Sequence, residues 1–264
     1  MLELQSISKT FHPGTIHAKK ALQDLSLSLN DGDFVTVIGG NGAGKSTLLN
    51  AIAGVWPVDE GNILIDGVDV TGLPEYKRAA FIGRVFQDPM LGTAPNMQIE
   101  ENLALALRRG KKRTLRWGVT KQEREDYYER LHALGLGLEK RMTDKVGLLS
   151  GGQRQALTLL MASLQKPKLL LLDEHTAALD PATAAKVLEI SDKIVRDGKL
   201  TALMITHNMT DAIRHGNRLI MMDQGRIVLD ISGEDKQKLT KADLLARFAQ
   251  TTGTQEETDS VLLS

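Results

Sequence analysis

A glycine-rich segment near the N-terminus carries residue types that can hold a phosphate group. Residues 39–46 read Gly-Gly-Asn-Gly-Ala-Gly-Lys-Ser and match the spacing G-x-x-x-x-G-K-S. Glycines let the backbone bend so that several N–H groups point at one anion, and a following helix adds partial positive charge. Lys45 can reach the β- and γ-phosphates of ATP, and the Ser46 hydroxyl can ligate Mg²⁺. The predicted nucleotide contacts are Gly39, Gly40, Asn41, Gly42, Ala43, Gly44, Lys45, Ser46 and Thr47.

A turn that only joins a strand to a helix is the alternative for this segment, but such a turn needs neither the lysine nor the serine. A second pair of chemically active residues, Asp173 and Glu174, directly follows Leu169–Leu172. Ligands gather at the carboxyl edge of parallel strands, so both carboxylates are expected near the phosphates. Asp173 can hold the magnesium shell, and Glu174 can polarise the water that attacks the γ-phosphate. A solvated strand end is the alternative for one carboxylate alone.

The elements that must position these residues are visible as apolar patterns. Phe34–Ile38, Leu169–Leu172 and Ala202–Ile205 are continuous apolar runs of the kind that form central parallel strands. Between the last two, Asp180 and Pro181 suit the start of a helix, and Gly198 is expected to follow its end. Strand–helix–strand alternation predicts an α/β fold with a largely parallel sheet. Leucines alternating with polar residues at 25–30 predict one half-buried strand.

Residues from about 88 to 165 have a different pattern. Two amphipathic helices are expected there, one marked by Ile99, Leu103 and Leu107 and the other by Tyr127, Leu131 and Leu134. This region is predicted to be a helical insertion between core segments at about 1–87 and 166–235. Residues 236–264 are expected to form a C-terminal helix and a polar tail that begins at Thr251.

Composition excludes several classes of protein. The 264 residues contain 33 basic and 33 acidic side chains, so net charge gives no general attraction to nucleic acid or anionic lipid. There is no cysteine, which excludes disulfides and thiolate metal sites and fits a reducing compartment. The N-terminus lacks the pattern of a secretory signal, and no apolar run approaches the roughly 18–20 residues that cross a bilayer.

The segment Leu149-Ser150-Gly151-Gly152-Gln153 resembles the signature sequence of the nucleotide-binding subunits of ATP-binding cassette (ABC) transporters. Ser150 can cap a helix whose Gly-Gly start exposes N–H groups to an anion. The resemblance extends over about residues 2–235 and implies a single ABC domain at 2–250. It implies a P-loop NTPase core with a mainly parallel sheet, an N-terminal antiparallel β subdomain and an inserted α-helical subdomain.

The same resemblance implies further site residues. Gln87 would touch magnesium and the attacking water, and His207 would contact the γ-phosphate. Phe11 would stack on adenine, with His12 as the weaker candidate. The segment that ends at Asp180 would communicate between two subunits. The implied catalytic residues are Glu174, His207 and Gln87, and the implied metal ligands are Ser46, Gln87 and Asp173. One departure, His175 where many relatives have proline or alanine, affects the packing of its loop.

The resemblance also implies partners. Two copies would pair head to tail, so that the phosphate loop of one faces Ser150, Gly151, Gly152 and Gln153 of the other. Residues 88–93 would contact a separate membrane permease, which works with an extracytoplasmic solute-binding protein; a simple interdomain turn is the alternative for this segment. The subunit would then lie in the cytoplasm, peripheral on the inner face of the membrane, and no nucleic acid is expected as a partner. The cation-rich run from Arg108 to Arg116 is interpreted as solvated surface, with anionic lipid contact as the alternative.

The predicted function is therefore ATP hydrolysis that energises an ABC transporter, with a bacterial solute importer favoured. The stretches around Gly147 and His175 resemble a binding-protein-dependent group with members linked to aromatic amino acids. Two alternatives stay open. One is a non-transport ABC ATPase acting on ribosomes or DNA, although neither tandem cassettes nor a coiled-coil insertion is present. The other is a P-loop kinase, in which the signature at residues 150–153 would have no role.

Overall fold

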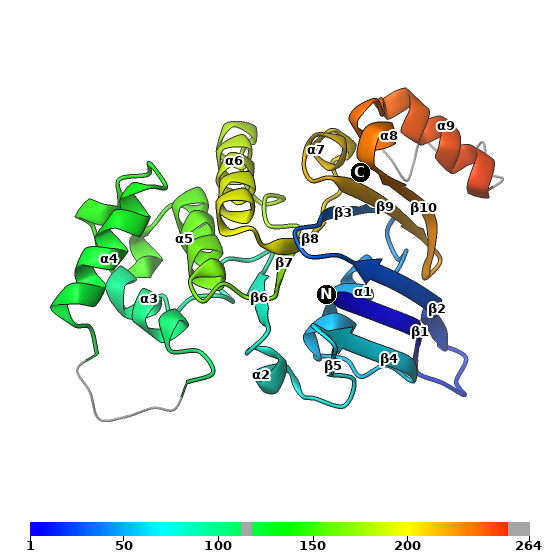
Figure 1. The fold of residues 1–264 in the computed structure, drawn as a ribbon, viewed down its shortest axis with the longest axis horizontal. Coiled ribbons are helices and arrows are strands. Elements are labelled where there is room, and N and C mark those ends of the chain that lie inside the picture. The colour runs from blue at the N-terminus through cyan, green and yellow to red at the C-terminus, as the bar shows by residue number, and fades with distance from the viewer. Residues whose placement is uncertain (112–117, 253–264) are drawn as a thin grey trace.

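Two β-sheets and a group of helices make up the computed structural model, which describes residues 1–111 and 118–252 (Figure 1). The larger sheet has six strands in the order β10-β9-β3-β8-β7-β6. The smaller sheet has four strands in the order β2-β1-β4-β5. Most helices cover the larger sheet on the side away from the smaller one (Figure 1).

The larger sheet holds the predicted central strands. Its members are β3 (Phe34–Ile38), β6 (Ile82–Val85), β7 (Leu169–Asp173), β8 (Thr201–Ile205), β9 (Arg218–Asp223) and β10 (Arg226–Ser232). All its strand pairs are parallel except the pair of β9 with the edge strand β10. Every residue of β3 and β8 is buried, as expected for strands covered on both faces. The predicted α/β fold with a mainly parallel sheet is confirmed.

The smaller sheet is antiparallel and comes from the N-terminal part of the chain. Its strands are β1 (Leu2–Phe11), β2 (Lys19–Leu29), β4 (Glu60–Ile65) and β5 (Val68–Asp69). In β2 the leucines at 25, 27 and 29 are buried and the serines between them are exposed, which confirms the half-buried strand. The helix α1 (Lys45–Ala53) shares one apolar core with this sheet and with β3, β7 and β8.

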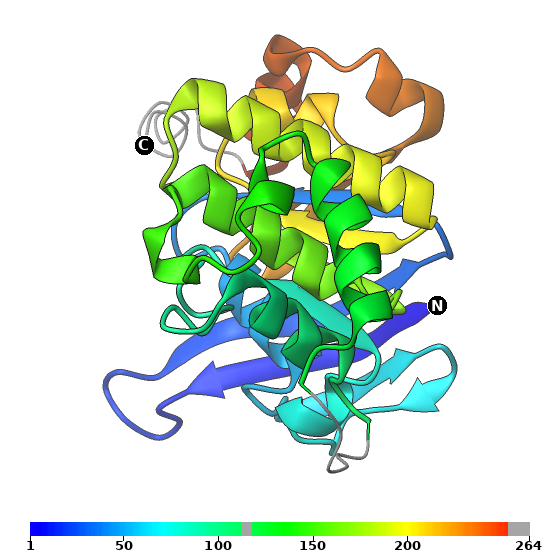
Figure 2. The ribbon, with the colours of Figure 1, turned by 90° about the vertical axis from the view of Figure 1, so that its left-hand side faces the viewer.

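Residues 99–163 contribute helices on the face of the larger sheet that is opposite to α1 and the smaller sheet. Figure 2 shows these helices in front, in green. They are α3 (Ile99–Leu107), α4 (Lys121–His132), the short 3₁₀ helices η1 (Leu138–Lys140) and η2 (Val146–Leu148), and α5 (Gly151–Ser163). Ile99 and Leu103 of α3 pack with Tyr127 and Leu131 of α4 in one buried cluster, which confirms both predicted amphipathic helices. We call α3, α4, η1, η2 and α5 the helical lobe.

The helix α6 (Pro181–Gly198) begins as expected and ends one residue later. Asp180 caps it, since its carboxylate accepts a hydrogen bond from the Thr183 N–H at 3.1 Å. The expectation that Gly198 follows the helix is wrong, because Lys199 takes the left-handed conformation there with φ 49°. A Cβ on Gly198 would lie 3.0 Å from Leu200 Cγ, so the glycine makes room for Leu200 to fold back.

Four further helices complete the described chain: α2 (Glu75–Arg78), α7 (Met209–Arg214), α8 (Gly233–Gln237) and α9 (Lys241–Thr252). Apolar residues of α7 and α9 form a third cluster with β9 and β10. Thr251 and Thr252 belong to α9, and the rest of the predicted polar tail lies outside the described residues. Across residues 1–111 and 118–252, none of the helices combines the length and apolar character required to span a membrane.

Candidate ATP-binding site

The glycine-rich segment turns the chain from the carboxyl end of β3 into α1. Gly44 stands at the N-cap of α1 with φ 102°, a conformation that favours glycine. A Cβ at this position would also lie 2.5 Å from the carbonyl oxygen of Ala21, so only glycine fits. Because Gly44 has no side chain to cap the helix, the first N–H groups of α1 can donate to a bound anion. The backbone therefore has the form that the motif predicts.

Lys45 is held over this loop. Its side chain is buried, and Nζ donates hydrogen bonds to the carbonyl oxygens of Gly39 at 2.6 Å and Gly40 at 3.1 Å. Burial lowers the pKa of the Lys45 ammonium, and the negative charge of Glu174 partly opposes that shift. A cation held in this way can exchange its carbonyl partners for phosphate oxygens of a nucleotide.

Glu174 and His207 meet because their strands are neighbours. β7 and β8 are parallel with Asp173 opposite Ile205, so the residues after each strand emerge side by side. The Glu174 N–H donates to Ile205 O at 3.1 Å, and the residue has φ 44°. His207 Nε2 lies 2.6 Å from Glu174 Oε2. The carboxylate is nearly buried while the imidazole is 40% exposed, so the histidine forms the outer wall of the pair.

Asp173, the last residue of β7, interacts with a side chain that the sequence did not single out. The Arg84 guanidinium on β6 lies 3.4 Å from Asp173 Oδ2. Burial raises the pKa of the Asp173 carboxyl, and the charge of Arg84 opposes that shift. Arg84 also donates to Asn50 Oδ1 on α1 at 2.8 Å. The one available signal was a charged residue inside an otherwise apolar strand, which requires a partner.

A pocket of about 200 Å³ brings several predicted residues together. It is lined by residues of the glycine-rich segment and by Phe11, Lys19, Ala21, Glu174 and His207. Lys19 was not predicted, because nothing in the local sequence around it differs from an exposed strand start. The predicted contacts Gly39, Gly40, Gln87 and Asp173 are not among the lining residues, nor are the signature residues 150–153 or Asp180. The pocket thus brings residues predicted to bind phosphate together with two predicted catalytic residues, Glu174 and His207, from a single chain.

Phe11 lies at the rim of this pocket, at the end of β1. Its ring packs edge-to-face against Trp56 with 5.0 Å between the ring centroids. Lys9 Nζ lies 5.8 Å from the Phe11 ring centroid. Such packing restricts how the Phe11 ring can turn, which suits a platform for a flat base. Stacking of adenine on Phe11 stays a prediction.

The signature segment forms the start of α5 in the helical lobe. The Ser150 hydroxyl accepts from the Gln153 N–H at 3.3 Å, and the Gln153 side chain accepts from the Ser150 N–H at 3.2 Å. These reciprocal bonds confirm the predicted cap. A Cβ on Gly152 would collide with the Thr183 side chain, so this glycine lets α5 approach the start of α6 closely. Hydrogen bonds from Thr183 lower the pKa of the Asp180 carboxyl beside it.

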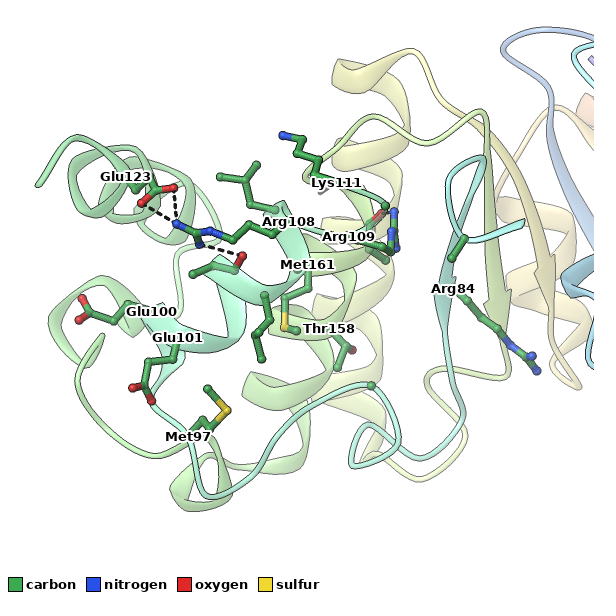
Figure 3. A pocket seen from close by; sticks show the side chains of 18 of the residues that line it. Arg84, Met97, Glu100, Glu101, Arg108, Arg109, Lys111, Glu123, Thr158 and Met161 are labelled. Carbon is green, nitrogen blue, oxygen red and sulfur yellow. Dashed lines mark hydrogen bonds and ion pairs between the residues drawn. The ribbon is translucent and has the colours of Figure 1, made fainter. Parts of the chain in front are cut away.

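A second and larger cavity lies between the helical lobe and β6 (Figure 3). It has a volume of about 1200 Å³, and its lining includes Arg84, Phe86, Leu91 and residues of α3 and α5. Leu91 is 71% exposed, and Leu105 is 47% exposed. We call this cavity the lobe groove. It adjoins the predicted permease-contact segment at residues 88–93.

The basic run begins at this groove, and its first members differ from the expected solvated surface. Arg108 donates to both carboxylate oxygens of Glu123, at 2.9 and 3.1 Å. Arg109 packs on α5, where its NH2 lies 3.5 Å from Ala162 O and burial lowers the pKa of its guanidinium. The expectation is wrong for these two residues, because their side chains turn toward the helical lobe. Residues 112–116 of the run lie outside the described residues.

Comparisons with known proteins agree with this geometry. Residues 22–177 match a family model described as ABC transporter, a range that includes the glycine-rich segment, the signature segment and Glu174. The chain is 46% identical over 248 residues to a tyrosine transport ATP-binding protein of Clostridioides difficile, covering 94% of this chain and 98% of that one. It is 34% identical over 250 residues to the spermidine/putrescine import ATP-binding protein PotA of Haemophilus influenzae. That match covers 94% of this chain but only 62% of PotA.

Solved structures show the same fold. A dimeric ATP-binding cassette, MJ0796, in a post-hydrolysis state with ADP and Pi, superimposes with a TM-score of 0.74 at 31% identity. The match covers 88% of this chain and 98% of that cassette. The family model matches more than half of the chain, and the first relative is similar over almost its whole length. This chain therefore belongs to the ABC transporter family, as one of its ATP-hydrolysing subunits.

Proposed function

We propose that two copies of this chain bind two molecules of Mg²⁺–ATP between them and hydrolyse them to drive import of a solute. The observation that carries this proposal is the contact of His207 with Glu174 at 2.6 Å, beside Lys45 and the phosphate loop. The signature segment of the same chain does not line that pocket. A second copy, rotated by a two-fold axis, would supply its own signature segment to each site. The dimeric state of the cassette MJ0796 supports such pairing.

Under this proposal the predicted site residues, inside and outside the pocket, have separate roles in hydrolysis. Lys45 and the α1 N-terminus bind the phosphates, and Phe11 carries the adenine ring. Glu174 accepts a proton from the attacking water, and His207 orients Glu174 and reaches the γ-phosphate. Gln87 is assigned to the water and the metal, although it stands exposed after β6. Asp180 and the signature residues 150–153 act on the nucleotide of the other copy.

Magnesium fits the oxygen donors at this site. Ser46, which carries a hydroxyl, lines the pocket, and Asp173 ends β7 next to Glu174. In nucleotide sites Mg²⁺ keeps several waters and takes one or two protein ligands besides the phosphates, so a closed cage of protein carboxylates is unnecessary. Among the described residues no such cage of three or more metal-binding side chains occurs. Bound there, the ion would neutralise charge on the β- and γ-phosphates, held by Ser46, Asp173 and Gln87.

The lobe groove is the proposed seat of the permease. Its exposed apolar side chains, Leu91, Leu105 and Tyr76, can receive a short helix of a membrane protein. Burial of such anchors supplies affinity for the partner helix. The subunit would then work at the inner face of the membrane, with an extracytoplasmic binding protein delivering the solute to the permease.

An aromatic amino acid is the proposed solute. The basis is the C. difficile relative, whose name assigns it to tyrosine transport and of which the match covers 98%. The chain itself does not touch the solute, so the assignment depends on its permease.

Reconstitution of this chain with its permease and a solute-binding protein tests the proposal. Proteoliposomes that contain the complex are expected to take up labelled tyrosine when ATP is supplied on the side of this subunit. A Lys45→Ala variant should bind nucleotide about 10- to 100-fold more weakly, because a charge-assisted contact is lost, and should abolish uptake. Uptake of spermidine or methionine instead of tyrosine would overturn the proposal that the solute is an aromatic amino acid. Co-purification with ribosomes or DNA, and with no permease, would overturn the transport function.

A further inference from the structure

Arg84 is a cation placed in a strand that is otherwise apolar. On β6 its neighbours Ile82 and Val85 are buried, and its own side chain is only 13% exposed. In the parallel pairing Arg84 lies opposite Leu171, so it shares a sheet face with Leu171 and Asp173. This face packs against α1. Burial of a guanidinium costs free energy unless the group is paired with an opposite charge and hydrogen-bonded, so the partners of Arg84 matter.

The contacts of Arg84 join the two halves of the magnesium site. One guanidinium nitrogen, NH2, donates to Asn50 Oδ1 at 2.8 Å and lies 3.4 Å from Asp173 Oδ2. The Asn50 amide in turn donates to the backbone carbonyl of Ser46 at 2.8 Å. The hydrogen-bonded series is therefore Ser46–Asn50–Arg84–Asp173. Its two ends are the hydroxyl residue and the carboxylate residue assigned to the metal.

The other side of Arg84 faces the lobe groove. Its guanidinium carbon lies 4.6 Å from the centroid of the Phe86 ring, and both residues line the groove. Figure 3 shows Arg84 at the end of the groove opposite Glu123. The Arg84 Nε is buried and has no hydrogen-bond partner within the described part of the chain. The side chain thus spans from the groove to the carboxyl edge of β7.

We propose that Arg84 is a positioning residue of the magnesium site: it orients the Asp173 carboxylate and, through Asn50, the Ser46 turn. Hydrogen bonds to a metal-binding carboxylate fix its direction, and their loss typically weakens metal binding by 10- to 100-fold. Because its two acceptors lie on α1 and on β7, the Arg84 guanidinium fixes both elements relative to each other. The inference rests on the proposed assignment of Ser46 and Asp173 to Mg²⁺.

The test replaces the guanidinium with an apolar side chain of similar length and measures binding instead of turnover. Arg84→Met and the unaltered chain are titrated with a fluorescent ATP analogue over a series of free Mg²⁺ concentrations and also in EDTA. We expect Arg84→Met to need about tenfold more Mg²⁺ for half-maximal enhancement of binding. Affinity in EDTA should stay within about threefold, because Lys45 and the α1 N-terminus are untouched.

Two further variants separate the possible outcomes. Asp173→Asn should shift the Mg²⁺ requirement at least as far as Arg84→Met does. If Asp173→Asn causes no shift, the metal assignment itself fails. If Asp173→Asn shifts the requirement and Arg84→Met does not, only the positioning role fails. Asn50→Ala should give an intermediate shift, because it breaks one arm of the series.

Arg218→Met is the matched control for loss of a partly buried, ion-paired arginine. Arg218 starts β9, is 17% exposed, and pairs with Asp230 at 2.6 Å away from the nucleotide pocket. Its Mg²⁺ requirement should equal that of the unaltered chain. Equal losses in EDTA and in Mg²⁺ for Arg84→Met would show general damage to the pocket and would overturn the proposal. Thermal unfolding of each variant reports separately on the stability of the fold.

Discussion

At the scale of single residues, the contact between Glu174 and His207 decides what the pocket can do. Glu174 is nearly buried, and its carboxylate has one oxygen 2.6 Å from the imidazole. A carboxylate held this firmly has little freedom to turn, which suits a base that must meet one water molecule. The main-chain bond from Glu174 N–H to Ile205 O fixes the residue from the other side.

Replacement of Glu174 by glutamine keeps the size of the side chain and removes its charge. ATP binding should persist, while turnover should fall roughly 100- to 10,000-fold because general-base assistance is lost. Bound ATP then holds the two copies together, so gel filtration with ATP and Mg²⁺ should show a lasting dimer. Glu189→Gln, on the exposed face of α6, is the control and should hydrolyse ATP normally. A Glu174→Gln protein that stays monomeric and hydrolyses at the normal rate would refute the role.

At the scale of elements, buried polar contacts tie the loop that follows β7 to α6. His175 follows Glu174 and is buried, with Nε2 2.9 Å from Ser191 Oγ on α6. The Ser191 hydroxyl donates to Val187 O at 2.9 Å, so His175 Nε2 must be the donor in its own bond. Burial lowers the pKa of His175 to about 4, so the ring is neutral at pH 7. His175, where many relatives have proline or alanine, therefore ties the loop after β7 to α6 through its hydrogen bond to Ser191.

A pH-dependent stability follows from this histidine. Between its ordinary pKa of 6.5 and its folded pKa of about 4, the unfolded chain binds a proton that the folded chain does not. The free energy of unfolding therefore falls as the pH drops through that window, and roughly 2 kcal/mol of it is lost at pH 5. Urea unfolding at pH 7.5 and pH 5 should show a smaller loss for His175→Gln than for the unaltered chain. Exposed His17 is the control, since His17→Gln should show the full loss; equal losses in all three proteins would contradict this account.

At the scale of the whole molecule, the two functional surfaces lie on different parts of the chain. The phosphate loop belongs to the core between the two sheets, and the signature segment belongs to the helical lobe (Figure 1). The lobe groove lies between that lobe and β6, where Arg84 reaches toward Asp173. Movement of the helical lobe relative to the core would change the shape of the lobe groove and the position of the signature segment together.

A charge placed in the groove should separate the subunit from its permease. Leu91→Glu removes an exposed apolar anchor and should weaken the complex at least 10-fold, since burial of one leucine contributes about 1.5–3 kcal/mol. Affinity for the permease in detergent or nanodiscs is the measurement. Val68→Glu, on β5 and 45% exposed, is the matched control and should bind normally. Unchanged affinity for Leu91→Glu would place the docking surface elsewhere.

The local features of this protein follow from short stretches of its sequence. The glycine-rich loop, the apolar strands and the caps at Ser150 and Asp180 depend on residues a few positions apart. Their conformations follow from backbone sterics and short-range hydrogen bonds, so patterns of residue type predict them. The order of the motifs also identified the family, because their spacing is specific.

Contacts between residues far apart in the chain, in contrast, depend on how the strands and helices are arranged in space. His207 reaches Glu174 because β8 lies beside β7 in a register that sets Ile205 opposite Asp173. Arg84 reaches Asp173 and Asn50 because β6 lies beside β7 in the sheet and the Arg84 side chain is on the sheet face that packs against α1. Arg108 and Arg109 turn inward because α4 and α5 offer acceptors. Strand order, register and packing depend on the whole chain at once, and no local pattern contains them.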